Sequence, residues 1–173
     1  MVTRALASAP SAYHLYITTV CSHSVSWIST STNTVTATVA VGACLYGIAV
    51  TPDGTRLYVA NQNGSTVSVI STATNTVIGT VPVGTFPDGV GVTPDGAQVY
   101  VANVGSNNVS VITTATNTVP ATGAAGSQPV AWRPLLPPAA VLPPPLARHA
   151  PSLLPPSPLH PPHTPPPPPL RGA

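Results

Sequence analysis

The sequence contains no glutamate and no lysine, and its only acidic residues are Asp53, Asp88 and Asp95. Five arginines are scattered along the 173 residues, so the formal net charge of +2 reflects a shortage of acids and not a basic patch. Nucleic acids and anionic membranes are bound by clustered basic side chains, so we expect neither as a partner. The sequence also offers few side chains that could act as the paired acid and base groups of a catalysed reaction.

Long apolar runs are missing too. None approaches the roughly 20 residues that a membrane-spanning helix requires, so no membrane span is predicted. The N-terminal segment has an early arginine but lacks the apolar stretch of a secretory signal peptide, and no signal peptide is visible. The two cysteines, Cys21 and Cys44, allow one disulfide without indicating an oxidising compartment.

What the chain does contain is a threefold repeat with a constant spacing of 42 residues and no insertions. The second and third copies carry "TPDGTRLYVAN" at 51–61 and "TPDGAQVYVAN" at 93–103, and a degenerate "APSA" at 9–12 stands in the first. The aligned positions include Tyr16, Tyr58 and Tyr100; Asn33, Asn75 and Asn117; and Gly42, Gly84 and Gly126. A fixed period of this length is typical of a repeat architecture.

Each repeat predicts four short strands, for example at residues 56–61, 66–71, 76–83 and 89–93. These segments are rich in β-branched and aromatic residues, and Pro, Gly and Asn in turn-forming clusters separate them. Apolar side chains occupy both faces of a strand, as Leu57 and Val59 alternate with Tyr58 and Ala60. A sheet with two apolar faces must be covered on both sides.

Four-stranded antiparallel units of roughly 40 residues, each covered by a neighbour on either side, are typical of a β-propeller. Leucine-rich and ankyrin-like repeats and parallel β-helices have shorter units, and a β-sandwich does not require a constant step. The sequence therefore predicts an all-β fold of the β-propeller type with about three four-stranded antiparallel blades. Closed propellers use roughly 4 to 8 blades, so we expect an open arc or part of a ring, and a homo-oligomer that completes the ring would cover the bare faces.

The motifs "LYVAN", "VYVAN", "TPDG", "VSVI", "TATNTV" and "VPVG" resemble the YVTN-family β-propeller repeat over about 125 residues. The first copy departs from that pattern, because "YITT" at Tyr16–Thr19 lacks the asparagine, and members commonly have Asp where this chain has Ser29, Ser71 and Thr113. The resemblance implies a bacterial or archaeal propeller that is secreted or belongs to the cell envelope. It also implies a fold similar to lactonase-type and haem d1-type propellers.

In a propeller, the loops between second and third strands and the loops between blades converge on one face. Asparagine in these loops is suited to a polar ligand or a carbohydrate, but tight turns select it as well. Asp88 departs from the repeat in one of these loops and is interpreted as a turn residue or a ligand contact. The ligand-binding candidates are Asn61, Gln62, Asn63, Phe86, Asp88, Asn103 and Asn107.

No catalytic residue is predicted. Asp53 and Asp95 lie in the repeated "PDG" turn, where aspartate supports turn geometry. Lactonase-like propellers depend on a Glu, His and Arg constellation in the channel, and a chain without glutamate cannot supply it. The tyrosines of the repeat are interpreted as packing residues between blades, and Trp27 as a core substitution for Val69 and Val111.

Cys21, His23 and Cys44 form the one constellation with metal-ligand chemistry, but a fourth ligand is missing and no established zinc spacing matches. We predict no metal and no cofactor. Cys21 and Cys44 either pair as a disulfide or remain two loop thiols.

The domain organisation follows from these patterns: a degenerate partial repeat at 1–12, three repeats at 13–129 and a proline-rich tail at 130–173. Of the 24 prolines, 17 lie after residue 129, which predicts a disordered or polyproline II segment or, alternatively, a frameshifted end. The predicted function is a non-catalytic binding or scaffold module whose ligand or protein partner is unknown. The alternative is a fragment of an enzymatic or cofactor-carrying propeller, lactonase-like or haem d1-like, that lacks its active blades.

Overall fold

Three antiparallel sheets of four strands each make up the described part of the chain in this computed structural model. The structure describes residues 3–8, 14–19 and 22–130, with residues 3–8 described by their backbone alone. All of them belong to one compact unit, Met1–Pro138. The predicted tail, apart from residue 130, lies outside the described residues.

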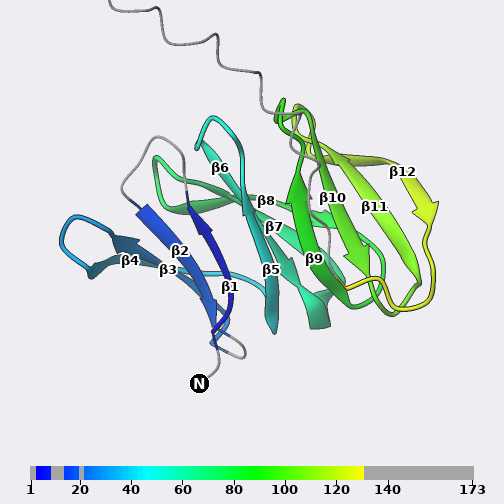
Figure 1. Cartoon of the computed structure of the whole chain (residues 1–173), viewed down its shortest axis with the longest axis horizontal. Coiled ribbons are helices and arrows are strands. Elements are labelled where there is room, and N and C mark those ends of the chain that lie inside the picture. Colours follow the sequence, from blue (N-terminus) through cyan, green and yellow to red (C-terminus); the bar gives the residue numbers. More distant parts are fainter. Residues whose placement is uncertain (1–2, 9–13, 20–21, 131–173) are drawn as a thin grey trace, which may run out of the picture. The chain divides into compact units, whose positions relative to one another are not determined.

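The strands of each sheet follow one another in chain order, so each sheet is an antiparallel meander and matches one predicted blade (Figure 1). Blade 1 contains β1 (Thr3–Ser8), β2 (His14–Thr19), β3 (Ser24–Ser29) and β4 (Thr34–Ala40). Blade 2 contains β5 (Leu45–Val50), β6 (Arg56–Asn61), β7 (Thr66–Ser71) and β8 (Thr76–Pro82), with a short 3₁₀ turn, η1 (Gln62–Gly64), between β6 and β7. Blade 3 contains β9 (Pro87–Val92), β10 (Gln98–Asn103), β11 (Asn108–Thr113) and β12 (Thr118–Ala124). The predicted all-β fold of the β-propeller type is confirmed.

The strand register repeats from blade to blade, as the constant sequence spacing predicts. Tyr16 is paired with Trp27, Tyr58 with Val69 and Tyr100 with Val111 on neighbouring second and third strands. Because side chains alternate between the two faces of a strand, an equal register places equivalent side chains on equivalent faces in all three blades. No helix among these residues is long and apolar enough to cross a bilayer.

The turns between the strands contain glycine, aspartate and asparagine at the positions where the backbone conformation or a hydrogen bond requires them. In the first "TPDG" turn, Gly54 has a φ of +73°, and Asp53 Oδ1 accepts hydrogen bonds from the Thr51 hydroxyl and from the Thr55 backbone N–H. Asn75 has a φ of 54° in the turn after β7, a left-handed conformation that asparagine tolerates well. These turns fix where each strand begins and ends.

The hydrophobic core lies between the blades, in two layers. In the first layer, Tyr16, Val25 and Trp27 of blade 1 pack with Leu57, Val59 and Ile70 of blade 2. In the second, Tyr58, Val67 and Val69 of blade 2 pack with Val99, Val101 and Ile112 of blade 3. Both faces of blade 2 are therefore covered, which the two apolar faces of its strands predicted.

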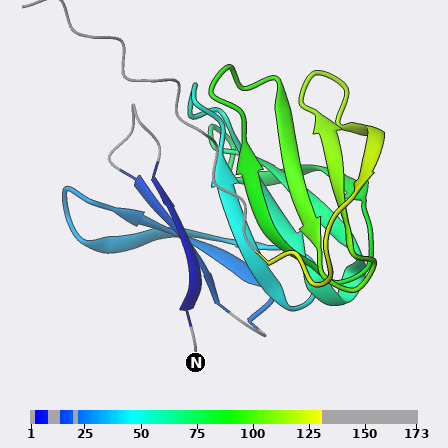
Figure 2. The same ribbon diagram turned by 45° about the vertical axis from the view of Figure 1, so that its right-hand side comes forward.

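The first strands of blades 2 and 3, β5 and β9, lie side by side in both views (Figures 1 and 2). Gly47 of β5 faces the backbone of β9 so closely that a Cβ atom at this position would overlap the Asp88 carbonyl oxygen. It would also lie 2.8 Å from the Val90 nitrogen. Only glycine allows the two strands to approach this closely.

Candidate functional site

The loops named as the candidate binding face come together in pairs through backbone hydrogen bonds. Gln62 N–H donates to the Cys44 carbonyl oxygen at 2.9 Å, and Val104 N–H donates to the Phe86 carbonyl oxygen at 3.0 Å. Each bond joins the loop between second and third strands to the loop that enters the same blade. We call this end of the blades the loop end, defined by residues 42–44, 62–65, 84–86, 104–107 and 126–128.

Two of the candidate asparagines are buried within the blades. The Asn61 amide nitrogen donates to the Thr66 and Ser68 hydroxyls at 3.0 and 2.9 Å. The Asn103 amide nitrogen donates to Asn108 Oδ1 and the Ser110 hydroxyl at 2.8 and 2.9 Å. Their Oδ1 atoms are buried without a hydrogen-bond partner among the described residues. The two amides therefore connect the end of the second strand to the third strand of the same blade.

A glycine of the preceding loop lies against each of these asparagines. A Cβ atom at Gly42 would come within 2.5 Å of Asn61 Cγ, and one at Gly84 within 2.7 Å of Asn103 Cγ. The repeated glycine and the repeated asparagine thus form one contact that ties successive blades together. The first copy has Thr19 in place of the asparagine.

The remaining candidates lie nearer the surface. Asn63 is exposed and its amide donates to Cys44 Sγ at 3.1 Å, while exposed Asn107 accepts from the Gln128 N–H at 2.9 Å. Gln62 and Asp88 are half-buried. The Phe86 side chain is 52% exposed at a φ of 52°, and its ring lies directly over Gly105. Phe86 is therefore an aromatic side chain held in a fixed position at the loop end.

The cysteine pair remains a prediction, because Cys21 lies outside the described residues. Cys44 is half-buried at a φ of 53°, and His23 is exposed at a φ of 55°. Within the described ranges, no three His, Cys, Asp or Glu side chains are grouped so that they could hold a metal ion.

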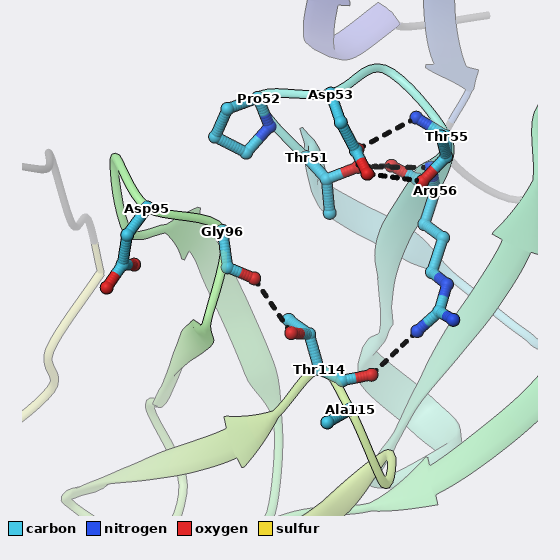
Figure 3. Close-up of a pocket in the computed structure, with 9 residues that line it drawn as sticks. All are labelled: Thr51, Pro52, Asp53, Thr55, Arg56, Asp95, Gly96, Thr114 and Ala115. Carbon is cyan, nitrogen blue, oxygen red and sulfur yellow. Dashed lines mark hydrogen bonds between the residues drawn. The ribbon is translucent and has the colours of Figure 1, made fainter.

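Two cavities open at the opposite end of the blades, among the turns that follow first and third strands. The larger has a volume of about 520 Å³ and lies between blades 2 and 3 (Figure 3). Its lining residues are Thr51, Pro52, Asp53, Thr55, Arg56, Asp95, Gly96, Thr114 and Ala115. We call this end of the blades the turn end.

The charged groups of the larger cavity are engaged in the turns themselves. Arg56 Nη1 donates to the Thr114 carbonyl oxygen at 2.6 Å and so joins blade 2 to blade 3. The Thr51 hydroxyl and the Thr55 N–H, which donate to Asp53, lower the pKa of that carboxyl. The Thr93 hydroxyl and the Ala97 N–H likewise lower the pKa of Asp95, whose carboxylate points away from Arg56 in Figure 3. Both carboxylates are therefore ionised hydrogen-bond acceptors of their own turns at neutral pH, and neither is poised as a general base.

The smaller cavity, about 360 Å³, lies at the equivalent place between blades 1 and 2. Its wall includes Tyr16 and Trp27, whose rings meet edge to face at 5.0 Å, and Asn75. Burial raises the pKa of Tyr16, and the neighbouring Trp27 offsets part of that rise. Even so, neither Trp27 Nε1 nor Asn75 Oδ1 has a partner with hydrogen-bond geometry among the described residues. Trp27 lies in the core, as its interpretation as a substitution predicts.

Sequence reasoning missed the turn-end cavities. The available signal was the aligned position two residues before each repeated tyrosine, where the three copies carry His14, Arg56 and Gln98. All three are polar and all three differ, although the two positions that follow carry an aliphatic residue and then tyrosine in every copy. His14 and Arg56 each line a cavity.

Comparison with known proteins identifies the blades. The family described as "Lactonase, 7-bladed beta-propeller" matches residues 10–128. The chain belongs to this family. The family match extends over the three predicted repeats and confirms that they form a propeller. No curated protein matches significantly.

Solved structures agree with the lactonase-family fold. Hydrazine synthase of Kuenenia stuttgartiensis is 32% identical, with a TM-score of 0.70 over 73% of this chain and 37% of that chain. A functionally unknown protein from Desulfotomaculum acetoxidans DSM 771 is 21% identical, with a TM-score of 0.67 over 75% of this chain and 44% of that one. The lactonase-family chain thus spans less than half the length of either of these structures.

Proposed function

We propose that this chain is a non-catalytic propeller module that binds a polar ligand or a protein partner through its loop end. The proposal rests on the position and exposure of the Phe86 side chain at the loop end. Its ring is half exposed and lies over Gly105, and the hydrogen bond from Val104 N–H to the Phe86 carbonyl oxygen holds the backbone that carries the ring. A large side chain whose position is fixed before binding loses little conformational entropy when it meets a partner.

The ligand class we favour is a neutral carbohydrate. Exposed amides at Asn63 and Asn107 supply both donors and acceptors for hydroxyl groups, and Phe86 offers an aromatic face to a sugar ring. We further propose that the three units are YVTN-type repeats and that the chain works outside the cell or in its envelope. The sequence resemblance supports both parts of this proposal.

The absence of catalysis is part of the proposal. The whole sequence has no glutamate and no lysine, and two of its three aspartates, Asp53 and Asp95, accept hydrogen bonds within their own turns. General acid-base chemistry requires a group that is free to exchange a proton with the substrate.

The test is binding to an immobilised panel of neutral oligosaccharides with the full chain and two variants. Phe86→Ala should lower the affinity for a bound glycan at least 10-fold, since it removes the central aromatic contact. Ile78→Ala is the matched control, because Ile78 is 49% exposed on β8, away from the loop end. Binding that Phe86→Ala leaves unchanged, or no binding to any glycan, contradicts the carbohydrate proposal.

A second candidate function rests on the family match itself. The chain covers 37% and 44% of two similar structures and belongs to a family described as lactonases, which favours a fragment of an enzymatic propeller. Under that alternative, lactonase-like or haem d1-like, the active residues lie in blades outside this sequence. Hydrolysis of a panel of simple lactones by the purified chain, above a heat-denatured control, would contradict both candidates, because neither places active residues in these three blades.

A further inference from the structure

The smaller cavity, between blades 1 and 2, has in its wall two residues with buried polar groups that lack hydrogen-bond partners. Trp27 is 2% exposed, and its indole Nε1 is a donor without an acceptor among the described residues. Asn75 Oδ1 is an acceptor without a donor in the same part of the chain. Both residues line this cavity of about 360 Å³. Because buried polar groups are nearly always paired, an unmatched donor and an unmatched acceptor in one wall indicate a ligand that pairs with both.

The equivalent interface between blades 2 and 3 has no such unmatched pair at its turn end, as far as the structure describes the chain. There the Tyr58 hydroxyl donates to Asn117 Oδ1 at 3.0 Å, so the acceptor at the position of Asn75 is satisfied. Val69 occupies the position of Trp27 and has no polar side-chain atom to satisfy. The tryptophan of the first repeat therefore adds a buried donor at the interface whose asparagine oxygen is also unmatched.

The wall of the smaller cavity favours an uncharged ligand. One arginine and two aspartates line the larger cavity, whereas the described wall of the smaller one contains neither residue type, and only His14 in it can carry a positive charge. Tyr16 and Trp27, whose rings meet edge to face at 5.0 Å, give this wall an aromatic part, and Thr36 and Thr72 also line it. An ion would lose its hydration here without a fixed opposite charge to replace it.

We propose that this cavity binds a small uncharged carboxamide, whose carbonyl oxygen accepts from Trp27 Nε1 and whose N–H donates to Asn75 Oδ1. A carboxamide carries its acceptor and its donor on separate atoms, so it can pair with groups from two different elements, β3 and the turn after β7. An apolar or aromatic body attached to the amide would contact the Tyr16 and Trp27 rings. The cavity volume lies at the lower end of the roughly 300–1,000 Å³ of small-molecule sites.

The pairing makes a prediction about ligands of the same shape. A carboxylate can only accept hydrogen bonds and an amidinium can only donate them, so each would leave one of the two buried groups unpaired. Benzamide, benzoate and benzamidine differ in this respect and are otherwise nearly isosteric. The site lies at the turn end, so its occupancy does not depend on the binding proposed for the loop end.

The experiment titrates these three probes into the isotopically labelled full chain and follows the indole N–H signals by two-dimensional NMR. The chain has two tryptophans, Trp27 and Trp132, and the spectrum of Trp27→Phe identifies the Trp27 signal. Benzamide should shift this signal in a saturable manner, with a Kd of about 1 mM for so small a ligand. Benzoate and benzamidine should bind about 10-fold more weakly or worse, because each leaves a buried group unpaired.

Two variants remove the two partners separately. Trp27→Phe keeps an aromatic ring without the donor, and Asn75→Gly removes the acceptor at a φ of 54° that glycine adopts without strain. Each should weaken benzamide binding about 3- to 10-fold, measured from the benzamide signals by saturation-transfer NMR. Asn117→Gly is the matched control, because it makes the same change in the equivalent turn of the other interface, and it should leave the affinity unchanged.

Several outcomes would overturn the proposal. One is the absence of a saturable shift of the Trp27 signal at millimolar benzamide, which is the result for a cavity that holds only water. Equal binding of the three probes would overturn it too, and so would an affinity that Trp27→Phe and Asn75→Gly leave unchanged or that Asn117→Gly lowers equally. Because the three probes are compared on the wild-type protein, a variant that fails to fold does not prevent the test.

Discussion

The Tyr58 hydroxyl donates a hydrogen bond to Asn117 Oδ1 in the neighbouring blade, at 3.0 Å. The equivalent acceptor one blade earlier, Asn75 Oδ1, is buried without a partner among the described residues. Burial raises the pKa of Tyr58, so the hydroxyl stays protonated and available as a donor over the physiological range. Asn75 and Asn117 occupy the same position of the repeat, but among the described residues only Asn117 accepts a tyrosine hydrogen bond that joins adjacent blades.

Replacement of Tyr58 by phenylalanine should lower the free energy of unfolding by about 1–2 kcal/mol, because it leaves the Asn117 acceptor without its donor. Tyr16→Phe is the matched control, since Asn75 Oδ1 accepts no hydrogen bond from any residue that the structure describes, and its effect should be clearly smaller. Urea denaturation followed by circular dichroism compares the two. Equal losses would show that the hydrogen bond between Tyr58 and Asn117 adds nothing beyond burial of the ring.

Gly84→Ala should destabilise the protein by about 1–3 kcal/mol, because the added Cβ would lie 2.7 Å from Asn103 Cγ. Asn103 cannot move aside without breaking its hydrogen bonds to Asn108 and Ser110. A Cβ atom added at the aligned Gly126 would meet none of the described residues within 4 Å, so Gly126→Ala should change the unfolding free energy by less than about 0.5 kcal/mol. Thermal melts of the two variants test the difference, and similar melting temperatures would contradict it.

Gly47→Ala should be more damaging than Gly84→Ala, because the obstacle is the backbone of β9 and not a side chain. Separating β5 from β9 would disturb the whole interface between blades 2 and 3, so we expect a loss of about 3 kcal/mol or more, or failure to fold. Gly123→Ala is the control, since its added Cβ would meet no atom of the described ranges within 4 Å. The soluble yield and the denaturation midpoint are the measurements, and a Gly47→Ala protein as stable as wild type would refute the close approach.

The "TPDG" turns should make the free energy of unfolding decrease at acidic pH. Hydrogen bonds lower the pKa of Asp53 in the folded state, so its contribution is present above the unfolded pKa of roughly 3.9 and is lost as the pH falls through the lower folded pKa. Thr51→Val removes the largest cause of the shift and should raise the pKa of Asp53 toward its ordinary value. Carboxyl chemical shifts across an acid titration give the result directly.

The third repeat supplies an independent replicate of this turn. Thr93→Val should raise the pKa of Asp95 in the same direction and leave Asp53 unchanged, because each hydroxyl serves its own turn. If Thr51→Val left the pKa of Asp53 where it is, the threonine hydroxyl could not be the cause of its depression.

The strands, the blades and the tyrosine packing could be predicted from sequence because each depends on local alternation and on a constant step. Tyr58 and Leu57 are neighbours that must point to opposite faces of one strand, and the repeat carries this relation from blade to blade. The role of Asn61 could not be predicted in the same way. Its side chain packs on Gly42, 19 positions earlier and before the preceding strand, and asparagine serves turns, ligands and such contacts equally well.

The turn-end cavities escape sequence reasoning for a related physical reason. Their walls come from turns that different blades contribute, such as Arg56 and Thr114, and the space between them depends on how closely the blades pack. Trp27 illustrates the point, because its identity predicts a buried residue. That its Nε1 lies beside Asn75 without a hydrogen-bond partner in the described part of the chain follows only from the three-dimensional arrangement.

At both interfaces between blades, the face that carries the repeated tyrosine, Tyr16 or Tyr58, packs on the aliphatic face of the next blade, and this fixed direction of stacking constrains how such a gene can change in length. Duplication or deletion of a whole 42-residue unit preserves every surviving joint, because each joint is built from the same two surfaces. An odd insertion within the third strand of a blade would exchange its two faces beyond that point, and in blade 2 it would place Ser68 where a valine now packs. Blade number can therefore vary among descendants in whole steps, while the distance between successive tyrosines stays fixed.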